Sequence, residues 1–466
     1  MLKQRLLVTI SFSFSIRYLY RTGLLKQLQD FSEIVIAITW NEKELIEELE
    51  NDGFEVHLVP EPVMQPAYNS IRKKIEYWFN AFQLQSPTRK IQIHYLNQYL
   101  SAKTVILRKT REWYNYLKFL LPGYSKRLFA REKQLLKTKT NFDVYVQWIN
   151  DLNIDSVFTV TPFHKQEDLL LRACKSAGKK MITSILSFDN ITKRSWIPVE
   201  YDCYMVWNKY NESELKRIYP FTINRPVTIT GAPQFDFYFK KDYLLSLNEW
   251  KNIVGLPFSD RKIILYAGGP QLLFPNEPQY LQHLDQAIND GLIKNNPVIL
   301  FRCHPIDKIE RWKKALNNST NIIFDHSWTG TENIFNANII NSDIKKLCST
   351  LAYTDVHINL CSTMTVDGST FKKPQIGPAY DAVNPDKEYL LQQMYHQEHF
   401  LPIIKTGGLL LATSKELLIK YVNDALENPV VYITKSNRII EEIITYTEGQ
   451  STSRVTKAIK DFLTNN

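Results

Sequence analysis

Short apolar runs rich in Val, Ile, Leu and Phe recur along this chain, and each run stops at a polar or glycine-containing turn. Longer stretches with the apolar spacing of amphipathic helices lie between them. This alternation predicts an α/β fold made of βα units, with parallel sheets between layers of helices. The runs expected to be strands are 5–10, 33–39, 55–59, 156–160, 180–185, 203–207, 227–230, 262–267, 298–301, 321–324, 357–360 and 375–376.

The length of the chain predicts two domains, because 466 residues exceed what one hydrophobic core usually supports. We expect a first domain over 1–241 and a second over 242–450, where the strand pattern starts anew. A final helical segment, 451–466, is expected to cross back to the first domain. Two sheets that face each other leave a cleft at the carboxyl ends of their strands, where open α/β sheets bind ligands.

Two strand ends in the second domain combine residues that suit an anion. Arg302 and His304 end one apolar run, and Ser362 and Thr363 follow another and open a helix. A helix N-terminus offers free backbone N–H groups and a positive dipole end, so this combination predicts a phosphate site. The alternative is structural: His304 would be a satisfied core histidine, and the serine and threonine would be helix caps.

Three further residues join this candidate site. Gly268 and Gly269 follow the run at 262–267 and would let a ligand approach the backbone closely, although many such pairs are only turns. Asp367 comes about one helical turn after Thr363, where it would reach a ribose hydroxyl or simply favour the helix dipole. The chain lacks the G-x-G-x-x-G and G-x-x-x-x-G-K-[ST] patterns, which disfavours dehydrogenases and P-loop NTPases.

In the first domain, His164 and Asp189 each follow a predicted strand. A transferase needs an imidazole or carboxylate that removes a proton from the acceptor hydroxyl, so both are candidate catalytic bases. An Asx turn is the structural alternative for Asp189.

Charge is concentrated in one segment, 68–140, which contains sixteen Lys and Arg against three Glu and also thirteen aromatic residues. Its net charge of +13 exceeds the +9 of the whole chain, so the remainder is slightly acidic. The segment is expected to be a basic helical insertion. It is either a solvated surface or a docking surface for anionic lipid headgroups. Nucleic acid is the least favoured partner, because no nucleic-acid fold signature accompanies the charge.

The R-x-H-P and S-T motifs around His304 and Ser362–Thr363 resemble those of GT-B glycosyltransferases, in particular bacterial sialyltransferases, capsule Kdo transferases and CDP-glycerol glycerophosphotransferases. The stretches 187–192, 206–208 and 230–236 are similar to bacterial surface-polysaccharide proteins of that fold. The resemblance covers most of the chain outside 68–140. It implies two Rossmann-like domains facing a cleft, with the nucleotide donor in the second. The D/E-D/E-G base motif of the sialyltransferases is missing, so the base stays open between His164 and Asp189.

By this resemblance the protein would be a metal-independent glycosyltransferase that moves a sugar or sugar-like group from a nucleotide-activated donor to a hydroxyl acceptor. His304, Ser362 and Thr363 would contact the donor phosphate, and Arg302 would help to balance its charge. The donor would be linked to CMP, CDP or UDP and is a substrate, so no cofactor and no metal are expected. The acceptor would be a glycan or lipid-linked molecule of the cell surface.

Two other functions remain compatible with the sequence. One is a non-hydrolysing nucleotide-sugar epimerase, and the other is a non-catalytic protein of the same fold that binds membranes or polysaccharide. Five scattered cysteines without a C-x-x-C pair are typical of a reducing compartment. We therefore expect a cytoplasmic protein, peripheral on the inner face of the membrane if 68–140 docks there.

Overall fold

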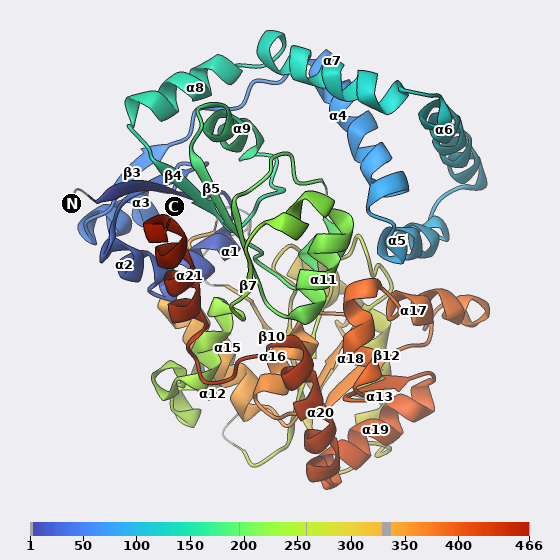
Figure 1. The fold of residues 1–466 in the computed structure, drawn as a ribbon. Coiled ribbons are helices and arrows are strands. Elements are labelled where there is room, and N and C mark those ends of the chain that lie inside the picture. Colours follow the sequence, from blue (N-terminus) through green and yellow to red (C-terminus); the bar gives the residue numbers. More distant parts are fainter. Residues whose placement is uncertain (1–2, 195, 258, 329–336, 466) are drawn as a thin grey trace. The chain divides into compact units, whose positions relative to one another are not determined.

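A computed structural model describes residues 3–194, 196–257, 259–328 and 337–465. The chain divides into two compact units, each built on a parallel sheet (Figure 1). The N-terminal unit comprises 1–89, 97–233 and 451–466, and the C-terminal unit comprises 90–96 and 234–450. Within the described residues, no helix combines the length and apolar character needed to cross a membrane.

The sheet of the N-terminal unit has seven strands in the order β3-β2-β1-β4-β5-β6-β7. Its core lies on both faces, because alternate side chains of β1 point in opposite directions: Leu6 and Val8 enter one apolar cluster and Leu7 enters another. The strands are β1 (Gln4–Ile10), β2 (Ser32–Ile38), β3 (Glu55–Leu58), β4 (Ser156–Thr159), β5 (Lys180–Ser184), β6 (Cys203–Val206) and β7 (Val227–Ile229).

Helices connect and cover these strands. They are α1 (Ser13–Ile16), α2 (Leu24–Gln29), α3 (Lys43–Asn51), α8 (Phe142–Asp151), α9 (Asp168–Ser176), α10 (Asn190–Lys193), α11 (Lys209–Ile218) and α21 (Ser451–Asn465), with a π-helical turn at Arg17–Arg21 and a 3-10 turn at Pro220–Asn224. The last helix, α21, lies beside α2 and buries Val455 and Ile459 in the same apolar cluster as Leu24 and Leu28 (Figure 1). Residues 451–466 thus return to the N-terminal unit.

The expected insertion between β3 and β4 is helical. It contains α4 (Pro66–Trp78), a π-helical turn (Phe79–Gln83), α5 (Pro87–Asn97), α6 (Ala102–Leu120) and α7 (Tyr124–Thr138). A buried ion cluster joins it to α9: Glu132 of α7 pairs with Arg72 of α4 and with Arg172 of α9, and both arginines also pair with Asp168.

The sheet of the C-terminal unit has six strands in the order β10-β9-β8-β11-β12-β13. They are β8 (Ile263–Ala267), β9 (Val298–Arg302), β10 (Ile322–Asp325), β11 (Val356–Asn359), β12 (Gln375–Pro378) and β13 (Leu409–Ala412). The helices are α12 (Leu247–Val254), α13 (Pro278–Asn289), α14 (Ile309–Ala315), α15 (Asn341–Tyr353), α16 (Met364–Thr370), α17 (Glu388–Met394), α18 (Leu401–Lys405), α19 (Lys415–Glu427) and α20 (Pro429–Ile443), with 3-10 turns at Lys241–Tyr243, Pro385–Lys387 and Glu398–Phe400.

The boundary between the units falls at Pro233 rather than near the expected Lys241. The 3-10 segment that follows, Pro233–Phe239, carries aromatic residues that pack within the C-terminal unit. Tyr238, for example, contacts Phe371 with ring centroids 5.3 Å apart. A segment anchored in this way belongs to the second core, although its sequence continues directly from β7.

Candidate active site

The strand register of the C-terminal unit aligns four strand ends in one row. Ala267 of β8 pairs with Arg302 of β9 on one side and with Asn359 of β11 on the other, and Arg302 pairs with Asp325 of β10. Neighbouring strands lie about 4.8 Å apart. Residues that directly follow β9, β8 and β11 therefore emerge at one edge of the sheet.

This edge contains the topological switch point of the sheet. From β8 the chain continues through β9 and β10 on one side, then crosses to β11 on the other. The connections leave the sheet in opposite directions there, and open α/β sheets commonly bind ligands outside the carboxyl ends of the strands at such a point. Gly268–Gly269 follow β8 and Ser362–Thr363 follow β11, so these two predicted segments flank the switch point, and His304 follows the next strand, β9.

Arg302 is 5% exposed and forms a buried ion pair. Its guanidinium Nη1 lies 2.9 Å from Oδ2 of Asp325, and Nη2 donates to the carbonyl of Ser327 at 2.8 Å. Lys346 of α15, which is also 5% exposed, contacts the other carboxylate oxygen of Asp325 at 2.9 Å. Two buried cations thus share one carboxylate beneath the edge, and Arg302 holds the β9 and β10 ends together.

His304 lies in the turn that follows β9 and is partly exposed. Its Nδ1 accepts the backbone N–H of Ile306 at 3.2 Å, and its carbonyl accepts the N–H of Asp307 at 2.9 Å. Since Nδ1 is the acceptor, the neutral ring carries its proton on Nε2. The hydrogen bonds of this turn thus favour the tautomer in which His304 can donate a hydrogen bond from Nε2–H.

The two glycines after β8 are required by packing. A Cβ on Gly268 would lie 2.9 Å from Cε2 of Phe301, and one on Gly269 would lie 2.7 Å from Cδ2 of Phe274. The N–H of Gly269 donates to the buried carboxyl of Glu277 at 2.8 Å. Burial raises the pKa of Glu277 to about 8, although the hydrogen bond from Gly269 opposes the shift. The backbone of Gly268–Gly269 is therefore held in place by Phe301, Phe274 and Glu277 of the same unit.

The turn between β11 and α16 is organised by Asn359. Its Oδ1 accepts the backbone N–H of Ser362 at 3.2 Å and the hydroxyl of Thr365 at 2.9 Å. Cys361 has a positive φ of 44°, and Ser362 Oγ accepts the N–H of Met364 at 3.2 Å. Helix α16 begins at Met364 with Thr363 as its exposed N-cap, so Ser362, which was expected to open the helix, lies in the turn before it.

Asp367 lies in α16 and is 7% exposed. Its Oδ1 accepts a hydrogen bond from the hydroxyl of Tyr238. This buried pairing fixes the Pro233–Phe239 segment onto α16. The expected contact with a ribose hydroxyl would have to compete with Tyr238.

The N-terminal unit has a switch point of its own, between β1 and β4. Ser11 Oγ and Thr161 Oγ1 lie 3.1 Å apart across it, and the hydroxyls of Thr159 and Thr161 each donate to Glu167 at 2.6 Å. All four residues are buried, and burial raises the pKa of Glu167 despite these hydrogen bonds.

His164 stands in the turn held by this buried network. Its backbone N–H donates to the carbonyl of Thr161 at 2.9 Å, and its ring stacks on Phe12 with centroids 6.1 Å apart. Burial, with a smaller contribution from the Arg194 cation, lowers the pKa of His164 to about 4. The imidazole is therefore neutral near pH 7, and its buried Nδ1 has no hydrogen-bond partner among the described residues.

Asp189, the other predicted base, lies after β5 and is 6% exposed. Its carboxylate pairs with Lys193 at 3.0 Å and accepts from the Asn190 side chain at 3.0 Å. The stretch around it is held by β6 and α11, since Trp207 Nε1 donates to the carbonyl of Ile185 at 3.0 Å and Asn211 Nδ2 to that of Phe188 at 2.8 Å. The Asp189 carboxylate is therefore already engaged by two neighbouring side chains.

Sequence reasoning missed several residues that shape both edges. Asp325 ends the apolar stretch 322–324 as Arg302 ends its own run, and this parallel was a usable signal. Asn359 was read as an ordinary strand residue. No local pattern identified Lys346, Glu277 or Tyr238, because their contacts arise from tertiary packing.

Comparison with known proteins identifies the family. The family model described as CDP-glycerol:poly(glycerophosphate) glycerophosphotransferase matches residues 173–461, which is more than half of the 466 residues. No curated protein matches the sequence.

Solved structures show the fold. A UDP-GlcNAc 2-epimerase from Neisseria meningitidis bound to UDP-GlcNAc is 10% identical, covers 98% of this chain and 100% of its own, and has a TM-score of 0.55. S. aureus MnaA in a structure with UDP is 11% identical, with coverages of 99% and 97% and a TM-score of 0.56. A glycosyltransferase from Rickettsia africae is 11% identical over 100% of both chains, with a TM-score of 0.51.

The two parallel sheets and these similarities confirm the expected GT-B architecture with a helical insertion in its N-terminal domain. They also confirm the expectation of a transferase over that of a non-catalytic protein. The chain belongs to the CDP-glycerol:poly(glycerophosphate) glycerophosphotransferase family and is a transferase of the GT-B fold.

Proposed function

We propose that this protein transfers a sugar or sugar-like group, such as a polyol phosphate, from a nucleotide-activated donor to a hydroxyl group of a cell-surface glycan or lipid-linked acceptor. The observation that carries the proposal is the register row of the C-terminal unit, in which Arg302, Ala267 and Asn359 lie side by side. Because these strand ends are aligned, the residues that follow them lie at one edge of the sheet, at its switch point: His304, Gly268–Gly269 and Ser362–Thr363.

The chemistry of the leaving nucleotide suits this edge. As the bond to the transferred group breaks, negative charge builds on the nucleotide phosphate, and preorganised donors lower the barrier. His304 supplies Nε2–H, and the turn before α16 supplies the hydroxyl donors of Ser362 and Thr363. Arg302 contributes indirectly, because its buried ion pair with Asp325 holds the strand end that precedes His304. With this charge balanced by protein groups, we propose that neither a metal nor a cofactor takes part.

On the acceptor side we propose His164 as the general base. A base must be unprotonated at the working pH, and the lowered pKa of His164 keeps its imidazole neutral. The turn that carries it is fixed to Thr161, whose hydroxyl is bound by the buried Glu167. Asp189, tied to Lys193, is the second candidate.

For the donor we propose a cytidine nucleotide first, since the matching family is described by its CDP-glycerol substrate. Thermal unfolding of the full chain with CDP, CMP, UDP, GDP and ADP tests this. A ligand at about one hundred times its Kd adds about 2.7 kcal/mol of stability, a rise in Tm of several degrees. Stabilisation by none of the five nucleotides would contradict the proposal.

Nucleotide-sugar epimerisation is the second candidate function. It is favoured by the likeness to UDP-GlcNAc 2-epimerases over nearly the whole chain. An epimerase acts on its donor without an acceptor. Incubation with UDP-GlcNAc alone therefore tests the second function: formation of the epimer or of free sugar supports epimerisation, and unchanged UDP-GlcNAc contradicts it.

We further propose that the protein works in the cytoplasm, at the inner face of the membrane. A lipid-linked acceptor is confined to that surface, so a transferase that acts on it must approach the bilayer.

A further inference from the structure

Helix α6 of the insertion has no buried residue along its 19 residues. It lies at the outer edge of the N-terminal unit (Figure 1). A helix in this position usually presents a polar outer face. The outer face of α6 is instead largely apolar.

Four apolar side chains form a stripe along this face: Ile106 is 62% exposed, Trp113 64%, Leu117 40% and Leu120 56%. Successive spacings of seven, four and three residues place them on one side of a helix, which turns about 100° per residue. Leu107 and Tyr114 lie alongside and are 61% and 55% exposed, and Leu121, the C-cap of α6, is 56% exposed. This is a continuous apolar surface rather than scattered exposed residues.

Cations flank the stripe on both sides. At about 100° per residue, Lys109 falls on one flank, and Lys103 and Arg111 fall on the other. All three are exposed, and Lys118 lies with its Nζ 4.1 Å from the ring centre of Tyr114. Apolar and aromatic residues between basic ones are the pattern of a helix that lies in a membrane interface.

The inner face of α6 is anchored, so the orientation of the stripe is fixed. Phe119 contacts the rings of Tyr77 and Phe82, with centroids 6.0 and 5.8 Å apart. Tyr116 stacks on Phe82 at 5.1 Å, and the hydroxyl of Tyr77 donates to the carbonyl of Glu112 at 2.7 Å. The surface is therefore already formed in the folded protein.

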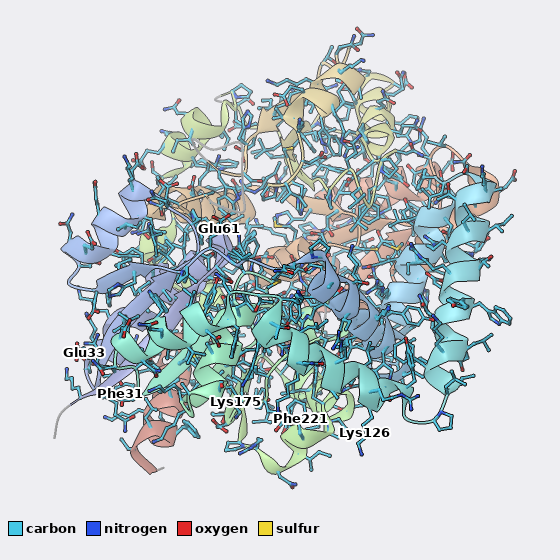
Figure 2. All side chains as sticks on the ribbon, turned by 90° about the horizontal axis from the view of Figure 1, so that it is seen from above. Phe31, Glu33, Glu61, Lys126, Lys175 and Phe221 are labelled. Atoms are coloured by element: carbon cyan, nitrogen blue, oxygen red, sulfur yellow. The ribbon has the colours of Figure 1, made fainter. Side chains whose placement is uncertain are left out.

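The neighbouring helix α7 extends the positive charge. Lys126, Arg127, Arg131 and Lys133 are exposed along it, with Lys126 near its start (Figure 2). Together the two helices combine apolar area with a concentrated positive field. This combination matches an anionic bilayer, where apolar side chains enter the acyl boundary and cations meet lipid headgroups. A second copy of the chain would bring like charges together, and a nucleic acid would leave the apolar stripe in water.

We propose that the outer face of α6, bordered by the basic residues of α7, docks in the plane of an anionic lipid bilayer. The surface belongs to the N-terminal unit alone, so it does not depend on nucleotide binding at the C-terminal unit.

The test is flotation of the full-length protein with phosphatidylcholine vesicles, with or without phosphatidylglycerol. We expect it to float with the anionic vesicles at about 0.1 M salt and not with phosphatidylcholine alone. The variant Ile106→Ser/Trp113→Ser should lower partitioning about tenfold or more, since it removes the largest apolar contacts. Val430→Ser/Val431→Ser on α20, where the side chains are 72% and 58% exposed, is the matched control.

The charge contribution is tested separately. Lys109→Glu/Arg111→Glu should lower partitioning about tenfold or more, whereas the control Lys313→Glu/Lys314→Glu on α14 should change it little. Quenching of Trp113 by brominated acyl chains, lost in Trp113→Phe, would show that the helix enters the bilayer. Absence of flotation, equal flotation of the α6 variants and the wild type, or self-association through α6 without lipid binding would each overturn the proposal.

Discussion

Arg302 at the end of β9 and Asn359 at the end of β11 lie in one register row, because both pair with Ala267 of the strand between them. Each supports a different part of the proposed phosphate site. Arg302 ties the strand end before His304 to Asp325, and Asn359 fixes the turn that carries Ser362.

Replacing His304 tests the leaving-group role. His304→Ala removes a donor to the departing phosphate and should lower kcat by about a hundredfold or more. His304→Gln, which keeps an N–H donor but no titratable charge, should retain more activity. The measurement is steady-state release of the nucleotide, with thermal unfolding as the check on folding. Wild-type turnover by His304→Ala would remove this residue from the mechanism.

The buried ion cluster makes Asp325 a stability determinant. Asp325→Asn leaves the Arg302 and Lys346 cations buried without their shared carboxylate, so we expect the free energy of unfolding to fall by about 3–5 kcal/mol. Urea unfolding measures this. Asp461→Asn in the exposed Lys457 pair, where the side chains are 74% and 52% exposed, is the control and should cost at most about 0.5 kcal/mol. Equal effects of the two substitutions would contradict the structural role of Asp325.

Glu277 should give the stability a pH dependence of known sign. Burial raises its pKa from 4.5 to about 8, so between these values the folded protein holds a proton that the unfolded chain has released. The free energy of unfolding then falls as pH rises, by about 1.4 kcal/mol per pH unit. The variant Glu277→Gln has no titratable group at this position, so its stability lacks this pH dependence. Between about pH 5.5 and 7.5, urea unfolding should show the wild type losing roughly 2.5 kcal/mol of unfolding free energy relative to Glu277→Gln. A difference that stays constant with pH would show that Glu277 is ionised in the fold.

The proposed base predicts where activity is lost in acid. His164 has a pKa of about 4 instead of 6.5, because burial disfavours its charged form. As pH falls, the imidazole stays neutral until that lower value, so the acid limb of kcat/KM should lie well below 6.5. His164→Gln should lower kcat by about 10²–10⁴ and abolish this limb. An acid limb at or above 6.5 would exclude the half-buried imidazole of His164 as the base.

The sequence predicted the two sheets well because most strands are β-branched or aromatic runs that end at polar or glycine turns. The strand β13 was missed, since Leu409–Ala412 is a short leucine run that periodicity cannot distinguish from helix. The boundary was expected near Lys241 but falls at Pro233, and the reason is different: the contact of Tyr238 with Asp367, which anchors the intervening segment, is tertiary.

The candidate site was predictable only in part. Strand-end motifs gave His304 and Ser362, and parallel strand order brings them to one edge. The partners of Arg302 and Gly269 were not predictable, because Asp325 and Glu277 meet them through register and helix packing. The lowered pKa of His164 was not predictable either, because it comes from burial, which a single strand-end motif does not reveal.

The most direct test of the central claim is calorimetric titration of the full chain with CDP, comparing the wild type with Ser362→Ala/Thr363→Ala. The account predicts binding by the wild type and an affinity at least about tenfold lower in the variant, since hydroxyl donors to phosphate are lost. Asp461→Asn, far along the chain in α21, should bind as the wild type does. Equal CDP affinity in the wild type and the double variant, or no binding of CDP or any other nucleoside diphosphate, would contradict it.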